Sequence, residues 1–295
     1  MKLGITTIQR GRAAYLLEWI AFHQVVGFER FIIYSHGADS EQEALLGFLS
    51  RIDPCISFYR WDYVSGRPQL RAYRHSWELH GKEVDAMAFI DGDEFLYSPE
   101  GELRSTVSRL LVPEASALGV YWMIYGSSGH MDEPDGLLIE HFTHHAEPNF
   151  SPNRHIKTIL RSGENARFVN SHFFVTRKGT IDELGRRIDE PVVTAFAPSH
   201  RHLCINHYVT QSWAYYHQVK RQMEQIDLPP EHRHERSEEW FLAHDRNECA
   251  SGYVQRFVLG TKLRMHELMT QVRRINPEYG APARSRLHTN QGAAN

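Results

Sequence analysis

Three acidic side chains, Asp91, Asp93 and Glu94, lie within four residues of one another, at the end of an apolar run that begins at Ala86. The run is typical of a buried strand, and Gly92 allows the backbone to turn tightly after it. Carboxylates this close repel one another, and a cation would offset the repulsion. Hard divalent cations bind one or two carboxylates and share substrate phosphates. The pattern predicts a metal site at a strand end; the alternative is an acidic turn in a solvated loop.

The composition of the chain restricts the classes of protein that it could be. Its 295 residues are enough for one large domain, or for a core with an appended lobe. The net charge of −3 gives no electrostatic reason to expect a nucleic-acid or anionic membrane partner. No apolar run is long enough to span a bilayer, and no signal-peptide pattern is present. Three widely separated cysteines, Cys55, Cys204 and Cys249, favour a reduced compartment, so we expect a cytoplasmic protein.

The N-terminal part of the chain alternates between strand and helix patterns. Strands are predicted at Leu3–Thr7, Phe31–Tyr34, Ile56–Tyr59 and from Ala86, and helices at Ala13–Val26, Glu41–Ile52 and Gln69–His80. Such an alternation predicts a parallel sheet with right-handed crossovers. In open α/β sheets, ligands bind in the crevice beyond the carboxyl ends of the strands. We therefore expect the loops 9–12, 35–40 and 91–94 to be neighbours.

The alternation stops after a helix predicted at Leu103–Leu111. Short strands separated by turn residues are predicted next, at Ala117–Tyr125, Leu137–Thr143, Ile156–Leu160, Phe168–Asn170, Phe173–Thr176 and Leu203–Asn206. Helical patterns follow at Ser212–Gln225, Ser237–Arg246 and Tyr253–Ile275. The sequence thus predicts a parallel half, a mixed half and a helical C-terminal part.

Four segments of the chain carry a resemblance to a known group of enzymes. They are Ala14–Tyr34, with an E-W-I-x-x-H helix followed by a strand; Phe89–Phe95, with D-x-D-E-F; Trp122–His130, with G-S-S-G-H; and Asn206–Ser212, with N-H-Y-x-T. Taken together and in this order, they resemble glycosyltransferases of the GT-A fold, in the group that contains families 2 and 92. One departure is Gln9-Arg10-Gly11, where that group usually has Lys-Asn-Glu.

The resemblance implies a fold and a division of the chain. The expected fold is α/β, a GT-A mixed sheet flanked by helices, with a C-terminal helical lobe. Residues 1–215 would form the core, with a nucleotide-binding half (1–98) and an acceptor half (99–215). A helical extension (216–277) and a disordered tail (278–295) would follow.

The resemblance also implies a reaction. The chain would transfer a sugar from a nucleotide-diphosphate sugar, in the first instance a UDP-sugar, to a glycan or other hydroxyl acceptor, with inversion. Mn²⁺ or Mg²⁺ would be held by Asp91, Asp93 and His207. The donor sugar, the acceptor, the linkage and the oligomeric state are left open.

Further site residues follow from the resemblance. The donor would be bound by Thr7, Arg10, Asp39, Asp91, Gly92 and Lys157, and the acceptor by Trp122, Gly126, Ser127 and Ser128. The candidates for the base that takes the acceptor's hydroxyl proton are His130, Glu133 and His172. Each role has a structural alternative: Asp39 could cap the next helix, Arg10 could be a surface arginine, and His207 could be a hydrogen-bonded core histidine.

Two other functions use the same residues. A metal-dependent phosphohydrolase would usually need a second metal, and therefore a denser cluster of histidines and acids. His144-His145 and His200-Arg-His202 are the compact histidine clusters in the sequence. A non-catalytic carbohydrate-binding protein could retain the fold without turnover. Loss of metal affinity with a retained glycan ligand would indicate that third function.

Overall fold

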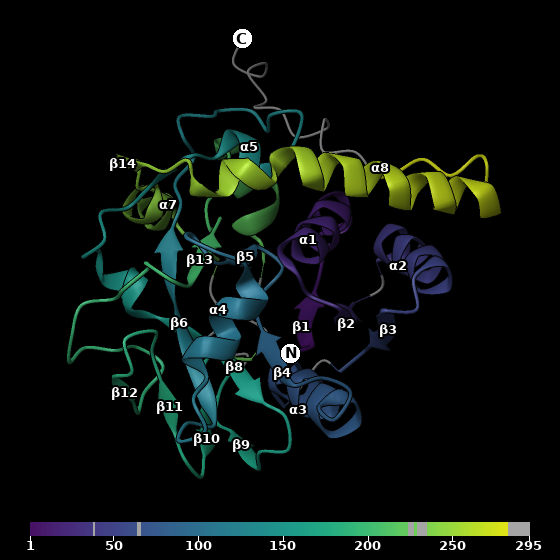
Figure 1. Ribbon diagram of the computed structural model, residues 1–295. Helices are drawn as coiled ribbons and strands as arrows, with labels where there is room; N and C mark the ends of the chain where they lie inside the picture. The colour runs from purple at the N-terminus through teal and green to yellow at the C-terminus, as the bar shows by residue number, and fades with distance from the viewer. Residues whose placement is uncertain (38, 64–65, 224–226, 229–234, 283–295) are drawn as a thin grey trace.

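The computed structural model describes residues 1–37, 39–63, 66–223, 227–228 and 235–282. A mixed sheet runs through the molecule, flanked by helices (Figure 1). Its strands are β1 (Leu3–Gln9), β2 (Arg30–His36), β3 (Ile56–Trp61), β4 (Ala86–Phe89), β5 (Glu94–Tyr97), β6 (Ala117–Ile124), β8 (Ile156–Arg161), β11 (Thr180–Ile181), β12 (Arg187–Ile188) and β13 (Cys204–His207). Two small sheets pair β7 (His144–His145) with β14 (Cys249–Ala250), and β9 (Ala166–Phe168) with β10 (Phe174–Thr176). The predicted α/β class with a mixed sheet flanked by helices is confirmed.

The helices are α1 (Ala13–Val26), α2 (Ser40–Ile52), α3 (Pro68–His80), α4 (Leu103–Leu110), α5 (Leu138–His141), α6 (Trp213–Tyr215), α7 (Glu238–His244) and α8 (Val258–Ile275). Short 3₁₀ turns lie at Ser151–Arg154 and Tyr253–Phe257, and a π-helical turn, Tyr216–Lys220, follows α6. Gly27 ends α1 in the left-handed conformation, with φ of 115°. The N-terminal helices and strands agree with the sequence prediction.

The parallel half is built as the alternation predicted. Strands β4, β1, β2 and β3 lie side by side and parallel, so the carboxyl ends of β1, β2 and β4 meet at one edge. Successive side chains of a strand point to opposite faces. Ile5 and Phe31 therefore pack with α1 and α2 on one face, whereas Ile32 and Tyr34 pack with α3 on the other. Both faces of the parallel strands are apolar and covered.

Two antiparallel strands bring later segments of the chain to the acidic turn. β8 pairs with β4, with Phe89 opposite Thr158, so Lys157 comes next to the end of β4. β13 pairs with β5, with His207 opposite Glu94. The antiparallel pairing therefore brings Lys157 and His207 next to the turn Asp91–Glu94. Both residues are far from this turn in the sequence.

The predicted strand at Leu137–Thr143 is wrong. The chain forms the short helix α5 there, because the buried carboxylate of Glu18 accepts hydrogen bonds from the backbone N–H groups of Leu138 (3.0 Å) and Ile139 (3.2 Å). A carboxylate that satisfies the first amides of a helix replaces a local cap. This acceptor comes from α1, far away in the sequence, so the local pattern could not reveal it.

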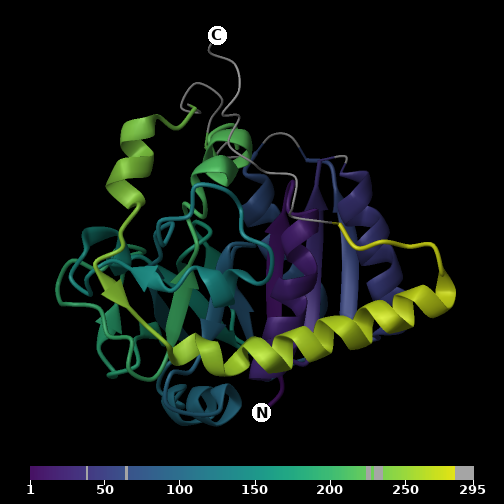
Figure 2. The same cartoon turned by 90° about the horizontal axis from the view of Figure 1, so that it is seen from above.

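The last helix of the chain, α8, lies across α1 and α2 and runs along one side of the molecule (Figure 2). Arg264 of α8 donates to Asp53 (2.9 Å) and to Gln24 (2.7 Å), which fixes the helix to the parallel half. Among the described residues, no helix combines the length and the apolar character needed to cross a bilayer. Residues 283–295 of the predicted disordered tail lie outside the described residues.

A buried histidine in α1 gives a test of the packing. His23 is fully buried; its Nδ1–H donates to the carbonyl of Trp19 (2.8 Å), and its Nε2 accepts from the backbone N–H of Leu96 (3.2 Å). The contact with Leu96 needs the neutral ring, and burial lowers the pKa of His23 from 6.5 to about 3. The unfolded chain thus binds a proton first as the pH falls, and the free energy of unfolding should decrease below about pH 6.5.

We expect His23→Gln, which keeps two polar functions without a titratable ring, to weaken this dependence. The slope of the free energy of unfolding against pH, measured by urea denaturation between about pH 6 and about pH 4, should fall by up to about 1.4 kcal/mol per pH unit. The other histidines and the carboxylates titrate in both proteins, so the difference isolates His23. Equal slopes would contradict the buried neutral ring.

Candidate active site

A cavity of about 860 Å³ lies beyond the carboxyl ends of β1, β2 and β4. The acidic turn forms its floor, and residues from the mixed half and from the segment after α6 form its walls. Its lining includes Gln9, Arg10, Arg12, His36, Arg67, Gln69, Asp91, Gly92, Asp93, Trp122, His155, His172, His207, Lys220, Asp227, Arg236 and Trp240. The predicted neighbours at the strand ends thus meet in one place, except that Asp39 is not part of the lining.

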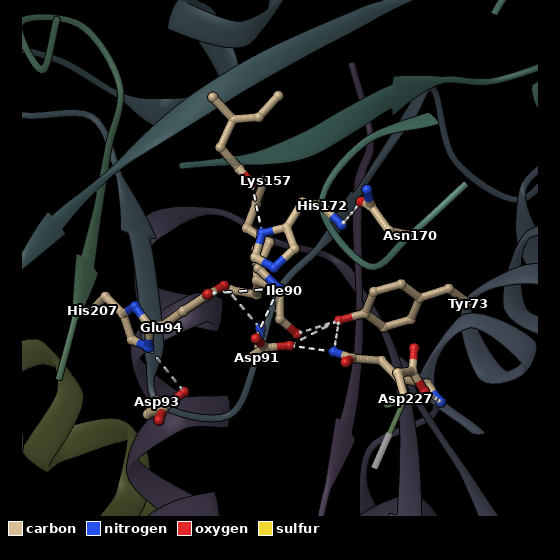
Figure 3. Close-up of polar contacts among 12 residues, drawn as sticks. Tyr73, Ile90, Asp91, Asp93, Glu94, Lys157, Asn170, His172, His207 and Asp227 are labelled. Carbon is tan, nitrogen blue, oxygen red and sulfur yellow. Dashed lines mark hydrogen bonds and ion pairs between the residues drawn. The ribbon is translucent and has the colours of Figure 1, made fainter. Parts of the chain in front are cut away.

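Asp91 is held by an ion pair with a buried lysine. Its Oδ2 accepts from Lys157 Nζ at 2.8 Å, and its Oδ1 accepts from the Tyr73 hydroxyl at 3.2 Å and from the amide of Gln69 (Figure 3). Burial raises the pKa of Asp91, but the ammonium of Lys157 outweighs it, and the net shift is downward. Asp91 is therefore an ionised carboxylate whose charge is already balanced by the protein.

Glu94 holds the acidic turn in shape. Its side chain is fully buried, and its Oε2 accepts from the backbone N–H of Asp91 at 2.9 Å. Its Oε1 lies 3.6 Å from Lys157 Nζ. Burial raises the pKa of Glu94 well above its ordinary value. A carboxyl group in that environment tends to be neutral, which limits the repulsion between the three acids.

Asp93 has two different partners. Lys220 Nζ lies 2.6 Å from its Oδ2, and His207 Nε2 lies 3.6 Å from its Oδ1. Figure 3 shows the His207 ring and the Asp93 carboxylate turned toward each other. Burial raises the pKa of Asp93, but the ammonium of Lys220 outweighs it, and the net value is well below the ordinary one. Burial lowers the pKa of His207, so its ring is neutral and able to bind a metal.

The donor set fits a cation that is shared with a ligand. Asp93 and His207 face one position, whereas the oxygens of Asp91 are directed to Lys157, Tyr73 and Gln69. Within the described part of the chain, no three His, Cys, Asp or Glu side chains converge on one point. A cage made entirely of protein ligands is therefore not formed, but cations that bind nucleotides use few protein ligands and complete their coordination with phosphates and water.

The rest of the floor and one wall are rich in cations. Arg12 is buried; it donates to the carbonyl of Gly92 (3.1 Å) and to the Tyr215 hydroxyl (2.5 Å). Gln9 is only 2% exposed, and within the described residues its side-chain amide has no hydrogen-bond partner. A Cβ at Gly92 would lie 2.8 Å from the Gln9 side chain, so a side chain at this position would have to displace the Gln9 amide. These contacts make the acidic turn, Gln9 and Arg12 one packed unit.

Two of the predicted donor residues lie elsewhere. Thr7 is fully buried within β1 and does not line the cavity. Asp39 accepts from the backbone N–H of Gln42 at 3.0 Å and caps α2, which is the structural alternative considered for it. Arg10, Gly92, Asp91 and Lys157 remain at or directly beneath the cavity floor.

The opposite wall is aromatic. The ring of Trp122 stacks on His155, with centroids 4.7 Å apart and an angle of 18°, and lies 4.3 Å from the ring of His207. Trp122 Nε1 is buried and has no hydrogen-bond partner among the described residues. Trp240 also lines the cavity. Flat ring faces beside polar groups suit the apolar face of a sugar ring.

The predicted acceptor loop, Gly126–Ser128, does not line the cavity. The backbone N–H of Ser127 donates to Asp245 (2.5 Å), and that of Ser128 donates to Asn247 (2.8 Å). A Cβ at Gly126 would lie 2.5 Å from the carbonyl oxygen of Arg246. The glycine is therefore required for close packing against the segment after α7, and the acceptor role of this loop stays a prediction.

The three candidate bases are in different environments. Glu133 is buried and accepts from the hydroxyls of Tyr15 (2.9 Å) and Ser212 (2.6 Å), away from the cavity lining. His130 Nε2 lies 3.3 Å from the carbonyl of His141, also outside the lining. His172 does line the cavity, its Nδ1 donates to the Ile156 carbonyl at 3.0 Å, and burial lowers its pKa to about 3. Of the three, only His172 is positioned to reach a ligand in this cavity.

Sequence reasoning missed several residues of the lining. Lys220 and Arg236 belong to helical or turn segments with no motif, and nothing in the local pattern distinguishes them from surface cations. Asp227 accepts from the backbone N–H groups of Gln69 (2.8 Å) and Leu70 (3.2 Å), and so caps α3 from far away in the sequence. Gln9 ends the first strand, and Arg12 lies three residues later. Both belong to the loop 9–12 that was expected at the strand ends, but neither was singled out as a site residue.

The sequence was compared with known proteins. The model of glycosyltransferase family 92 matches residues 9–244. A glycosyltransferase family 92 protein of Oryza sativa subsp. japonica is 24% identical over 213 residues, which are 71% of this chain and 33% of that protein. One of Arabidopsis thaliana is 25% identical over 171 residues, 54% of this chain and 28% of that protein. The chain thus spans about a third of the length of these plant relatives.

A solved structure, that of TarS from S. aureus, has a TM-score of 0.35 and 13% identity, and covers 55% of this chain and 47% of that one. The structural match therefore covers only about half of each chain. The family match, in contrast, extends over most of the chain and includes the acidic turn, Lys157, His207 and Lys220. The chain belongs to glycosyltransferase family 92.

Proposed function

We propose that this protein is a metal-dependent glycosyltransferase that moves a sugar from a nucleotide-diphosphate sugar to a hydroxyl group of a glycan or similar acceptor. A UDP-sugar is the first candidate for the donor. The observation that carries this proposal is the pair Asp93 and His207, which face one position at the floor of a cation-rich cavity. Family membership supports the reaction class. Such a cavity, at the carboxyl ends of parallel strands, suits a ligand that carries a diphosphate.

Charge compensation is what the donor requires. Among the described residues, Arg10, Arg12, Arg67, Lys220 and Arg236 line the cavity, against Asp91, Asp93 and Asp227. Because Asp91 is already paired with Lys157, these five cations outnumber the other two carboxylates, and this excess of positive charge suits a diphosphate. Mn²⁺ or Mg²⁺ would be held by Asp93 and His207, with Asp91 beside them, and imidazole with carboxylate suits Mn²⁺. When bound, the cation would act as a Lewis acid on the leaving diphosphate.

The acceptor would bind on the aromatic wall. Trp122 and Trp240 line this wall, and His155 and His172 lie next to Trp122. Inversion needs a group that takes the hydroxyl proton of the acceptor. We retain His172 for this role on its position, because its Nδ1–H donates to Ile156 and leaves the Nε2 lone pair as acceptor. The ring is thereby oriented by the backbone. Its lowered pKa keeps that lone pair unprotonated at neutral pH but makes the ring a weak base.

A first test separates donor from acceptor binding. We expect Arg10→Ala to weaken UDP binding by about tenfold, since a guanidinium that pairs with phosphate is lost. Trp122→Ala should change UDP affinity only a few-fold but strongly reduce transfer to the acceptor. Isothermal titration calorimetry with UDP and Mn²⁺, together with a transfer assay, measures both. Arg109→Ala, on the exposed side of α4, is the matched control. An equal loss of UDP affinity in Arg10→Ala and Trp122→Ala would contradict the assignment of Arg10 to the donor and Trp122 to the acceptor.

A second test concerns the base. His172→Ala should reduce the transfer rate by about a hundredfold or more, with UDP affinity unchanged within a few-fold. His130→Ala is the matched histidine control, and should retain most of the activity because His130 lies outside the cavity lining. The ratio of the two turnover numbers at saturating donor is the quantity to compare. A loss in His130→Ala as large as that in His172→Ala would exclude the assignment.

A further inference from the structure

Lys220 occupies an unusual position in the cavity. It ends the π-helical turn Tyr216–Lys220, and it is only 8% exposed. π-helical turns are rare and frequently occur at functional sites. Arg236 fixes the backbone there, because its Nη1 donates to the carbonyl oxygens of Lys220 (2.9 Å) and Met223 (2.6 Å). The anchored turn directs the ammonium onto Asp93, 2.6 Å from Oδ2.

The ammonium and a divalent cation compete for the same carboxylate. Asp93 is the carboxylate that, with His207, faces the position described above for a cation. An ammonium at hydrogen-bond distance from Oδ2 already balances the charge of Asp93 and would repel a second cation beside it. A bare cation therefore gains little by binding to the protein alone.

A bound diphosphate changes this balance. Lys220 also lines the cavity, and the lysine side chain is a point charge on a flexible stem. A diphosphate in the cavity offers the ammonium a second anion, so Asp93 becomes available to the cation. Lys157 differs, because it is 1% exposed and lies between Asp91 and Glu94. It has no such alternative and remains a fixed counter-ion.

We propose that Lys220 holds the place of the divalent cation on Asp93 until a nucleotide diphosphate binds, so that nucleotide and cation bind as a coupled pair. This inference rests on the proposed function. It concerns only the order and coupling of binding, and it does not depend on which sugar is transferred. The cavity would then be protected from free metal ions that arrive without a donor.

The Mn²⁺ affinity of the 295-residue protein, with and without UDP, tests the proposal. It is measured by electron paramagnetic resonance of free Mn²⁺ or by calorimetry. In the wild-type protein, UDP should strengthen Mn²⁺ binding strongly. In Lys220→Met, Mn²⁺ alone should bind about tenfold more tightly than in the wild type, because the competing charge is gone. The effect of UDP on Mn²⁺ affinity should shrink accordingly. Lys262→Met, on α8 and paired with Glu140, is the matched control and should behave as wild type.

The outcomes separate the two proposals. If Mn²⁺ alone binds Lys220→Met no better than wild type, while UDP still promotes Mn²⁺ binding in both, the role of Lys220 is wrong and the donor proposal stands. If UDP with Mn²⁺ binds to neither protein, the proposed function fails.

The melting temperature gives a second measurement. Lys220→Met leaves Asp93 without its ammonium partner, so the melting temperature of this variant should fall, and Mn²⁺ alone should restore it. Lys220→Gln, a polar variant, is the second neutral replacement, and absence of tighter Mn²⁺ binding in it would likewise overturn the inference.

Discussion

Compensation of negative charge at the turn Asp91–Glu94 is the constraint on which the rest of the structure depends. Three carboxylates are packed at the end of a buried strand, and the protein balances them in three ways: Lys157 on Asp91, Lys220 on Asp93, and burial that favours the neutral form of Glu94. Loss of one partner of a buried ion pair typically costs about 3–5 kcal/mol, because a charge remains uncompensated. The lysines that the fold supplies therefore stabilise the turn.

This requirement explains the order of the strands. A purely parallel sheet would bring only the ends of β1, β2 and β4 to the turn. β8 is antiparallel to β4 and carries Lys157, and β13 is antiparallel to β5 and carries His207. The π-helical turn after α6 then adds Lys220. The parallel half thus forms the floor of the cavity, and the mixed half and C-terminal segment supply the groups that make the floor stable and chemically useful.

The sequence predicted those parts of the site that are local or belong to a motif. The acidic turn and the parallel strands before it followed from apolar runs and glycine positions. The approach of His207 followed from the family resemblance that the N-H-Y segment carries. Lys220, Arg236 and Asp227 could not be predicted, because their roles come from contacts across the fold and not from their neighbours in the sequence. The packing of the Gly126–Ser128 loop is a further contact across the fold: Gly126 lies against the Arg246 backbone, and the Ser128 N–H donates to Asn247. Glu133 likewise has partners far away in the sequence, because it accepts from the hydroxyls of Tyr15 and Ser212.

The central claim is that Asp93 and His207 form the cation position of a donor site balanced by lysines. Anomalous X-ray scattering from a crystal of this protein with Mn²⁺ and UDP tests it most directly, because manganese is located independently of any structural model. The account predicts one strong manganese peak within coordination distance of both Asp93 and His207, with the diphosphate beside it. A peak at another site, or a bound nucleotide with Lys220 still on Asp93 and no manganese there, would contradict it.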